Sequence, residues 1–248
     1  MKPHPNASSA DQHPINYQIR RSERAQKTRI VVSAGKIEVV APLKISEQRI
    51  HAFVTAQHAW IRDALKRVQH RAQNSPSLAP TAYSNGVLVP FQGRQIPLTI
   101  KPTSAKRLRV QFSDDHFLVY FPEIIADDGS ERIKAALESW MKQHTRQLAL
   151  QWIEKHSASH SLIPRSLRIK TQKSRWGSCG PYNDINLNWL LILGPPVIME
   201  YVVVHELCHI RHKNHSRDFW QLVADHMPDY LKHRQWLKQY GASLMRGL

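Results

Sequence analysis

The chain has 248 residues, 42% of them hydrophobic and 22% charged, an ordinary composition for a globular protein of one or two domains. Its apolar stretches are far too short to span a bilayer, and the opening residues, MKPHPNASSADQHP, lack the hydrophobic segment of a secretory signal. Because two cysteines cannot build a disulfide framework, we expect a cytoplasmic protein without a membrane partner.

The chain is strongly basic: 35 lysines and arginines against 19 acidic residues give a formal net charge of +16. A field of this sign attracts polyanions, and nucleic acid is the natural candidate for a partner of the basic surface. The sequence has no RNP-type aromatic motif, zinc knuckle or helix-turn-helix pattern. A solvated basic surface without a nucleic-acid partner is therefore the competing interpretation.

The N-terminal part is predicted to begin with a tail and a few strands. Residues 1–14 are polar, contain three prolines and are expected to form a disordered tail. Alternating residues predict a strand at residues 15–21. Two more strands, residues 29–33 and 36–40, flank Ala34-Gly35, which predicts a hairpin.

A single long helix is predicted after these strands. Ser46 is a suitable N-cap, and the helix is expected to reach about Ala72 because apolar residues recur at spacings of three and four. Its opposite face is basic and could lie on nucleic acid, although a solvated face is the simpler expectation. The basic residues are Arg62, Lys66, Arg67 and Arg71.

Two further hairpins complete the first half. Their paired strands are residues 87–91 with 94–100 and residues 107–112 with 116–121. The turns are supplied by Gln92-Gly93 and by Ser113-Asp114-Asp115. Residues 15–125 are therefore expected to form an antiparallel, β-rich region with one long helix. It contains no catalytic constellation, so a scaffold or substrate-docking role is expected.

Residues 126–248 are expected to form a small α+β domain that opens with a second long helix. Asp128 and Glu131 have the spacing of a capping box, and this helix is predicted to end near His156. Its apolar residues form one stripe, which predicts that the helix packs against the rest of the domain. They are Ile133, Leu137, Trp140, Met141, Leu148 and Trp152.

Two short strands, residues 167–172 and 185–189, are predicted next, and the loop between them carries two residues of chemical interest. Arg175 could anchor a substrate carboxylate, stabilise an oxyanion or be structural. Cys179 is expected to be an inert thiol, with a role as a metal ligand as the alternative. Gly194-Pro195-Pro196 then begins another helix, since proline suits a first helical turn.

That helix contains His205-Glu206-Leu207-Cys208-His209, which has the H-E-x-x-H pattern. Histidines four residues apart lie on one helical face about a turn apart, so both imidazoles can bind one metal ion. Glu206 lies beside the first histidine, where its carboxylate can take a proton from a metal-activated water without being a ligand. Cys208 within the motif is expected to be a buried, inert thiol.

A catalytic site of this kind needs a third protein ligand, and we predict His215. His212 lies on the same helical face, but seven residues of helix would separate it from His205 by about 10 Å. Lys213-Asn214 is a plausible helix exit that turns the chain back. Ser216 can then cap a helix at residues 217–226, and a last helix is expected at residues 230–244.

The stretch from Gln172 to Trp220, with QKSRWGSC, INLNW and YVVVHELCHIRHKNHSRDFW, resembles the YgjP-like metallopeptidase family, whose relatives are the SprT-like and WLM zinc peptidases. A weaker resemblance extends from about Ile19 to Tyr240. It implies a small zincin-like domain with one Zn²⁺ ion per chain. The residues that it assigns are the metal ligands His205, His209 and His215 and the catalytic glutamate Glu206.

The expected function is that of a zinc-dependent metallopeptidase acting on a protein or peptide substrate, with Glu206 as general base. Candidate groups for stabilising the transition state or contacting substrate are Arg175, His212, His226 and Tyr230. Two alternatives stay open. The chain could be a nucleic-acid-associated protein with a structural or vestigial zinc site, for which Cys179, His226 or His212 would have to supply a fourth ligand. It could also be a peptidase recruited to nucleoprotein.

Overall fold

The structure is a computed structural model that describes residues 15–23, 25–33, 36–74, 77–123, 129–158 and 161–248. The predicted tail, the hairpin turn at Ala34-Gly35 and the predicted capping residue Asp128 lie outside these residues. The chain divides into two compact units, Met1–Asn74 and Ser75–Leu248, and each is described by itself. Within the described residues, no helix is long and apolar enough to cross a membrane.

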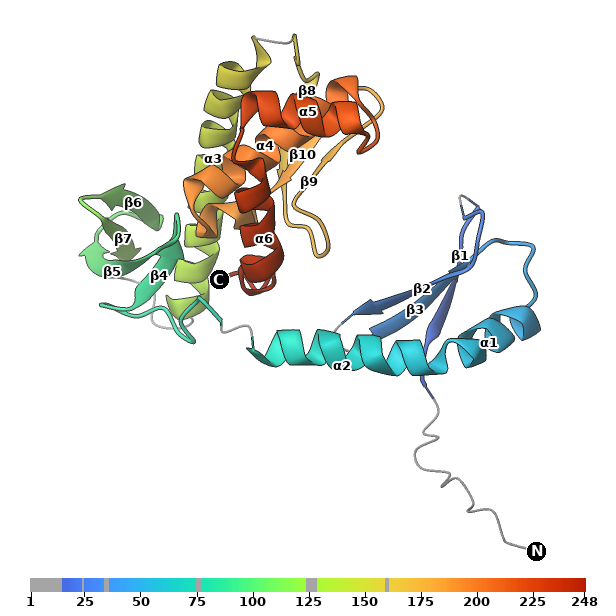
Figure 1. Ribbon diagram of the computed structural model, residues 1–248. Coiled ribbons are helices and arrows are strands. Elements are labelled where there is room, and N and C mark those ends of the chain that lie inside the picture. Colours follow the sequence, from blue (N-terminus) through green and yellow to red (C-terminus); the bar gives the residue numbers. More distant parts are fainter. Residues whose placement is uncertain (1–14, 24, 34–35, 75–76, 124–128, 159–160) are drawn as a thin grey trace, which may run out of the picture. The chain divides into compact units, whose positions relative to one another are not determined.

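The first unit is a three-stranded sheet with two helices packed against it (Figure 1). Its elements are β1 (Gln18–Arg21), β2 (Arg29–Ser33), β3 (Lys36–Ala41), α1 (Glu47–Ala56) and α2 (His58–Asn74). The central strand β3 is antiparallel to β2, which confirms the predicted hairpin, and parallel to β1. The core between sheet and helices consists of Ile37, Val39, Ala41, Ile50, Val54 and Ile61.

The long helix predicted after Ser46 is divided into α1 and α2 at Gln57. The Ser46 side chain accepts a hydrogen bond from the backbone N–H of Arg49, so its predicted role as N-cap is confirmed. The division escaped prediction because the apolar residues stay in phase across it. Val54 and Ile61 are separated by seven residues, about two helical turns, and both are buried in the same core.

The second unit contains a four-stranded sheet in the order β4-β5-β7-β6. Its strands are β4 (Leu88–Phe91), β5 (Arg94–Thr103), β6 (Arg109–Ser113) and β7 (His116–Pro122). Both predicted hairpins are confirmed, and Gln92-Gly93 and Asp114-Asp115 turn the chain with φ angles between 50° and 77°, as tight hairpin turns require. The two hairpins join through β5 and β7, which are parallel, so the sheet is mixed and not wholly antiparallel.

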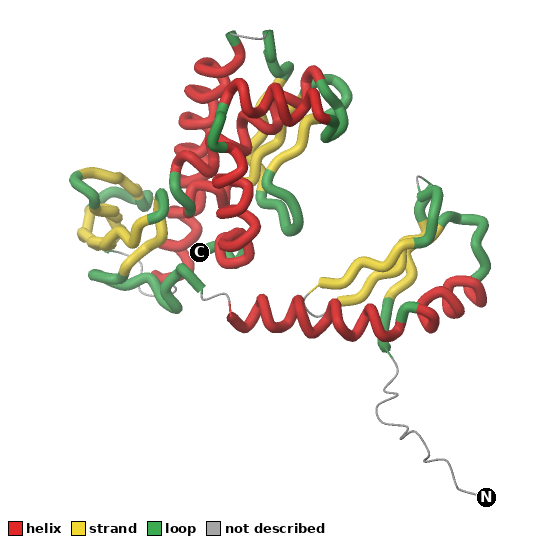
Figure 2. Tube along the Cα trace, viewed as in Figure 1, coloured by secondary structure: helices red, strands yellow, loops and turns green. Residues whose placement is uncertain are grey.

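A second sheet in this unit has three strands in the order β8-β10-β9. They are β8 (Ser166–Lys170), β9 (Gly177–Cys179) and β10 (Asp184–Asn188). The middle strand, β10, is parallel to β8 and antiparallel to β9, which leaves β9 at the edge of the sheet. Figure 2 shows the two sheets of this unit as separate groups of strands beside its helices.

The helices of the second unit surround α4 (Figure 1). They are α3 (Gly129–Ser157), the 3₁₀ helix η1 (Trp189–Leu193), α4 (Pro196–Arg211), α5 (Arg217–His226) and α6 (Tyr230–Leu244). Each of these helices contacts α4, as do β9 and β10. A helix with neighbours on every side must be apolar around most of its circumference, and the first half of α4, PVIMEYVVV, has this composition.

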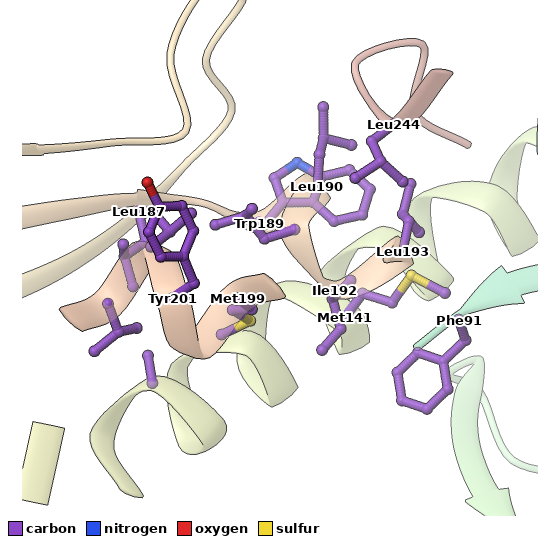
Figure 3. Close-up of a cluster of buried hydrophobic side chains, with 14 of the residues drawn as sticks. Phe91, Met141, Leu187, Trp189, Leu190, Ile192, Leu193, Met199, Tyr201 and Leu244 are labelled. Atoms are coloured by element: carbon purple, nitrogen blue, oxygen red, sulfur yellow. The ribbon is translucent and has the colours of Figure 1, made fainter. Parts of the chain in front are cut away.

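The larger of the two hydrophobic cores formed by the described residues includes the buried side chains of α4, and Figure 3 shows part of it. All five residues of η1 are buried, and in Figure 3 Trp189 and Leu193 lie among side chains from β10, α3, α4 and α6. Asn188 begins η1, and its side-chain oxygen accepts a hydrogen bond from the backbone N–H of Leu190. This apolar segment fixes where α4 begins.

The turn between β4 and β5 is fastened to the same region. The backbone N–H groups of Gln92 and Gly93 donate hydrogen bonds of 2.7 and 3.0 Å to the carbonyls of Ile192 and Leu193. Gly93 has a φ of +77°, and a Cβ there would lie 3.0 Å from Cγ of Pro195, the residue before α4. Glycine is therefore needed here both for the turn and for the close approach.

The compact units differ from the predicted regions 15–125 and 126–248, because the four-stranded sheet belongs with the helices of the second unit. Its aromatic side chains pack on α3: the rings of Phe91 and Phe117 lie 5.5 and 5.3 Å from the ring of Trp140. The sequence shows that each of these residues is apolar, but it does not show which apolar faces meet.

Candidate metal centre

The helix α4 carries two of the three predicted metal ligands. Pro196 occupies its first turn, where proline lacks an N–H group that would have no intrahelical partner. Further along the helix, His205 and His209 lie one turn apart on the same face, with ring centroids 4.9 Å apart. The buried apolar residues of α4 hold this face in position.

A tight reversal after α4 brings back the third histidine. His212 ends the helix in an extended conformation (φ −118°, ψ 104°). Ser216 begins α5, and its hydroxyl accepts a hydrogen bond from the backbone N–H of Phe219, as a helix cap does. Between these two points the chain turns, and Nε2 of His215 comes within 3.1 Å of Nε2 of His205.

The three histidines form a set of nitrogen donors that fits a divalent metal ion. Their ligand atoms all lie within 4.8 Å of one another. Two imidazole nitrogens at about 2.1 Å from one tetrahedral zinc ion would be about 3.4 Å apart, close to the spacing of His205 and His215. Among the described residues, no fourth Cys, His, Asp or Glu belongs to this group. Such a set leaves one coordination position open, as catalytic sites do.

Neighbouring groups orient the three imidazoles. The buried ring of Phe219 lies 5.0, 4.5 and 4.8 Å from those of His205, His209 and His215. Nδ1 of His209 is hydrogen-bonded to the backbone carbonyl of His212 at 2.9 Å, which leaves Nε2 to face the other histidines. His212 thus supports a ligand through its main chain, and its own imidazole is not part of the group.

Burial favours the neutral imidazoles of His205 and His209, the form in which histidine binds a metal ion. Burial lowers the pKa of His205 to about 3, with further lowering from the positive charges that His209, His215 and Arg234 can carry. Burial also lowers the pKa of His209. At neutral pH these two side chains therefore present nitrogen lone pairs and carry no proton that a metal ion would have to displace.

Glu206 extends from the same helix into a buried position beside the histidines. Only 5% of the residue is exposed, and Oε2 of its carboxylate has no hydrogen-bond partner among the described residues. Burial raises the pKa of Glu206 to about 8, against the lowering effects of the Arg175 charge and of a hydrogen bond from the Cys179 backbone. A buried carboxyl group with a shifted pKa and one oxygen without a hydrogen-bond partner is typical of a catalytic carboxylate.

The strand β9 forms the wall against which this carboxylate lies. A Cβ on Gly177 would lie 2.5, 2.7 and 2.9 Å from Oε1, Cγ and Cδ of Glu206, all shorter than any normal contact. Gly177 therefore leaves the space that the glutamate occupies. The sequence analysis missed this residue, although its place in the Trp-Gly-Ser-Cys segment of the loop before β10 was the available signal.

One buried amide anchors the loop that carries Arg175. Nδ2 of Asn188, a fully buried residue, donates hydrogen bonds of 2.8 and 3.2 Å to the carbonyls of Gln172 and Arg175. The backbone N–H of Asn188 donates a third, of 2.8 Å, to the carbonyl of Trp176. These hydrogen bonds fix the loop next to β9. The Arg175 side chain is exposed, and its charge lowers the pKa of Glu206.

Neither cysteine belongs to the histidine group. Cys208 is fully buried, and burial raises the pKa of its thiol to about 12. Cys179 is partly buried, with its Sγ 3.9 Å from Nζ of Lys213. Burial raises its pKa as well. Lys213 also donates a 2.8 Å hydrogen bond to Asn183, which ties the turn after α4 to the turn between β9 and β10.

Tyr230 and His226, the remaining predicted contact residues, have different neighbours. Tyr230, at the start of α6, stacks on Trp220 with ring centroids 5.4 Å apart, and Trp220 in turn stacks on His215 at 5.5 Å. Tyr230 is therefore connected to the histidine group through one ring. His226 packs edge-on against His156 at 5.4 Å. The sequence analysis missed Trp220 and Arg234, whose guanidinium lies 4.6 Å from the centre of the Trp220 ring.

A mixed α+β unit that folds a third histidine onto a helix with two histidines and a buried glutamate has the architecture of a metallopeptidase. The family model described as "YgjP-like, metallopeptidase domain" matches residues 26–240, and the chain belongs to this family. Most of both compact units falls within that match.

Among solved structures, the chain is similar to one described as the crystal structure of the metallopeptidase zymogen of Pyrococcus abyssi abylysin. The identity is 18%, the similarity covers 42% of this chain and 95% of that chain, and the TM-score is 0.29. At this level no residue role is transferred. No curated protein matches the sequence.

Proposed function

We propose that the chain is a zinc-dependent metallopeptidase in which His205, His209 and His215 hold one zinc ion and Glu206 acts as general base. One observation carries the proposal: three imidazoles converge beside a buried carboxylate that has an unengaged oxygen. Membership of a metallopeptidase family supports the same conclusion independently of the geometry.

The three histidines would bind the ion through nitrogen, and Oε2 of Glu206 would remain available for proton transfer. A divalent ion held in this way supplies Lewis acidity, which polarises a peptide carbonyl and lowers the pKa of water. Glu206 then takes the proton from the attacking water and passes it to the leaving amine. The positive charge of Arg175 favours the ionised form of the Glu206 carboxylate, because an opposite charge lowers a carboxyl pKa.

We propose that the backbone of the substrate peptide pairs with the edge strand β9. An extended peptide can add to the exposed edge of a sheet through main-chain hydrogen bonds. Among the strands that the structure describes, β9 pairs with β10 alone, and it lies directly against Glu206. A peptide on its other edge would therefore run past the proposed base. Arg175, whose charge acts on Glu206, and Tyr230, which stacks on Trp220, are proposed to contact the substrate or its oxyanion.

The test is the metal content of the purified full-length protein, measured by mass spectrometry together with peptide cleavage. We expect about one zinc per chain in the parent, little in His215→Ala, and a full complement in Glu206→Gln. Cleavage should be absent in both variants. A parent that holds no metal after zinc is supplied, or a Glu206→Gln variant that cleaves like the parent, would refute the proposal.

We further propose that the first unit recruits the enzyme to nucleic acid in the cytoplasm. The observation behind it is the exposed basic face of α2, where Lys66 and Arg67 project outward from the helix that covers the sheet. Binding to duplex DNA should weaken steeply with salt. Lys66→Glu with Arg67→Glu should abolish that binding, while peptide cleavage by the second unit stays at the parent level. Binding that survives this double variant would contradict the assignment.

A further inference from the structure

A cavity of about 340 Å³ opens between α5 and α6, beside the histidine group. We call it the α5–α6 cavity, and its lining residues are Arg217, Trp220, Gln221, Ala224, Tyr230 and Arg234. Neither the proposed zinc site nor the proposed base uses it. Its lining has no acidic residue, although two arginines and two aromatic side chains face it.

Both guanidinium groups are available for a ligand. Arg217 and Arg234 are exposed, and among the described residues neither forms an ion pair with a carboxylate. Two cations that share a small cavity repel each other, and a cavity lined by one sign of charge concentrates ions of the opposite sign. The lining therefore favours occupation by an anion.

The cavity is connected to the metal centre through a continuous stack of rings. Arg234 lies over Trp220, with 4.6 Å from the guanidinium carbon to the ring centre, and Tyr230 stacks on the same ring. Trp220 also stacks on the imidazole of His215, with an interplanar angle of 23°. A group bound in the cavity would thus be separated from His215 by the Trp220 ring.

We propose that the α5–α6 cavity is a subsite that binds a carboxylate of the peptide substrate. This inference rests on the proposed peptidase function and adds a preference for one class of peptide. The planar fork of a guanidinium pairs with the two oxygens of a carboxylate, and this pairing is strongest where arginine is held in place, as Arg234 is by Trp220. Gln221 also lines the cavity, and its amide donates a hydrogen bond of 3.0 Å to Asp225.

A carboxylate fits the cavity better than a nucleotide does. Stacking of a base requires an open aromatic face, but His215, Tyr230 and Arg234 already crowd the Trp220 ring. A carboxyl group, in contrast, needs only the guanidinium edges. Two sources of carboxylate share this chemistry: an aspartate or glutamate side chain, and the free C-terminus of the peptide.

The first experiment measures cleavage preference with the zinc-loaded full-length protein and a peptide library prepared by digesting a proteome. Mass spectrometry of the products should show acidic residues enriched at one position relative to the cleaved bond, or cleavage at a fixed distance from the C-terminus. Repeating the experiment with C-terminally amidated peptides separates the two sources. A preference that survives amidation belongs to a side chain, and one that disappears belongs to the terminal carboxylate.

Variants then connect the preference to the cavity. Arg234→Met and Arg217→Met should each lower kcat/KM for a preferred peptide about tenfold or more, the effect of losing one charge-assisted bidentate pair. The loss should be much larger for acidic peptides than for neutral ones, which cannot form the guanidinium–carboxylate pair. Lys238→Met is the matched control, since it removes one positive charge from an exposed position of α6 outside the cavity. A parent without any acidic preference, or an unchanged preference in both arginine variants, would overturn the proposal.

A binding measurement keeps the inference separate from catalysis. Immobilised Glu206→Gln protein is exposed to the same library, and retained peptides are identified. Acidic peptides should be retained, and adding Arg217→Met should release them whether or not the parent cleaves anything. A single-stranded oligonucleotide is applied to the same immobilised protein in a parallel run. If Arg217→Met releases the oligonucleotide and not the acidic peptides, the carboxylate assignment is wrong. Should Arg234→Met fail to fold, the exposed Arg217 still provides the test.

Discussion

The replacement of Gly177 by alanine tests how closely the proposed base is held. The new Cβ would lie 2.5 Å from Oε1 of Glu206 and 2.7 Å from its Cγ. Real Cβ atoms do not approach other atoms so closely, so either the carboxylate or β9 must move. The glutamate has little room to yield, because only 5% of the residue is exposed.

The magnitude follows from the cost of overpacking, about 1 to 3 kcal/mol for an added methyl group in a close-packed interior. In a unit of this size, 1 kcal/mol lowers the melting temperature by about 2 to 4 °C. Displacing a catalytic group by about 1 Å costs roughly 100-fold in rate. We therefore expect Gly177→Ala to melt several degrees lower and to cleave about 100-fold more slowly, with its zinc content unchanged.

The assay combines thermal unfolding, zinc content and steady-state cleavage of one peptide. Gly180→Ala is the matched control: it lies one residue beyond β9, and its added Cβ would meet its nearest atoms at 3.6 and 3.9 Å, which is ordinary contact. The control should behave like the parent. If Gly177→Ala cleaves at the parent rate, Glu206 is not confined as the geometry implies, and the reasoning fails.

Three further predictions concern the supports of the site. Asn188→Ala should lower the free energy of unfolding by about 1 to 3 kcal/mol in urea titrations, because the carbonyls of Gln172 and Arg175 lose their donor; an unchanged midpoint would contradict this. Phe219→Ala should cost about 3 to 5 kcal/mol and also weaken zinc binding in competition with a chelator, since its ring contacts all three histidines. Zinc at 100 times its Kd should stabilise the parent by about 2.7 kcal/mol in thermal unfolding. His215→Ala should gain little from the same zinc, and an equal gain would place the metal elsewhere.

Several parts of the fold could be predicted because their signals are local. Gln92-Gly93 identifies its hairpin through residues that tolerate positive φ, and the structure has the turn at that point. Ser216 identifies the start of α5 through its capping hydroxyl. The spacing of His205 and His209 likewise determines their shared face, because helix geometry alone produces it.

Other features depend on contacts between distant segments, which spacing does not encode. The parallel pairing of β5 with β7 joins two hairpins whose turns specify only their own strands. Gly177 acquires its importance from a helix that follows it in the sequence by almost thirty residues. Arg234 and Trp220 meet only because α6 packs near α5, so the cavity that they line could not be predicted.

The contacts of the β4–β5 turn with η1 and Pro195 determine where this protein can be divided into fragments. The backbone N–H groups of Gln92 and Gly93 are hydrogen-bonded to carbonyls of η1, and Gly93 lies against Pro195 at the start of α4. A fragment that began after residue 125 would lack the β4–β5 turn that contacts η1 and the start of α4. It would also expose the aromatic face of α3. Gene fusion or domain shuffling that transfers the proposed metal centre must carry the four-stranded sheet with it, and the junction after Asn74 is the place to cut.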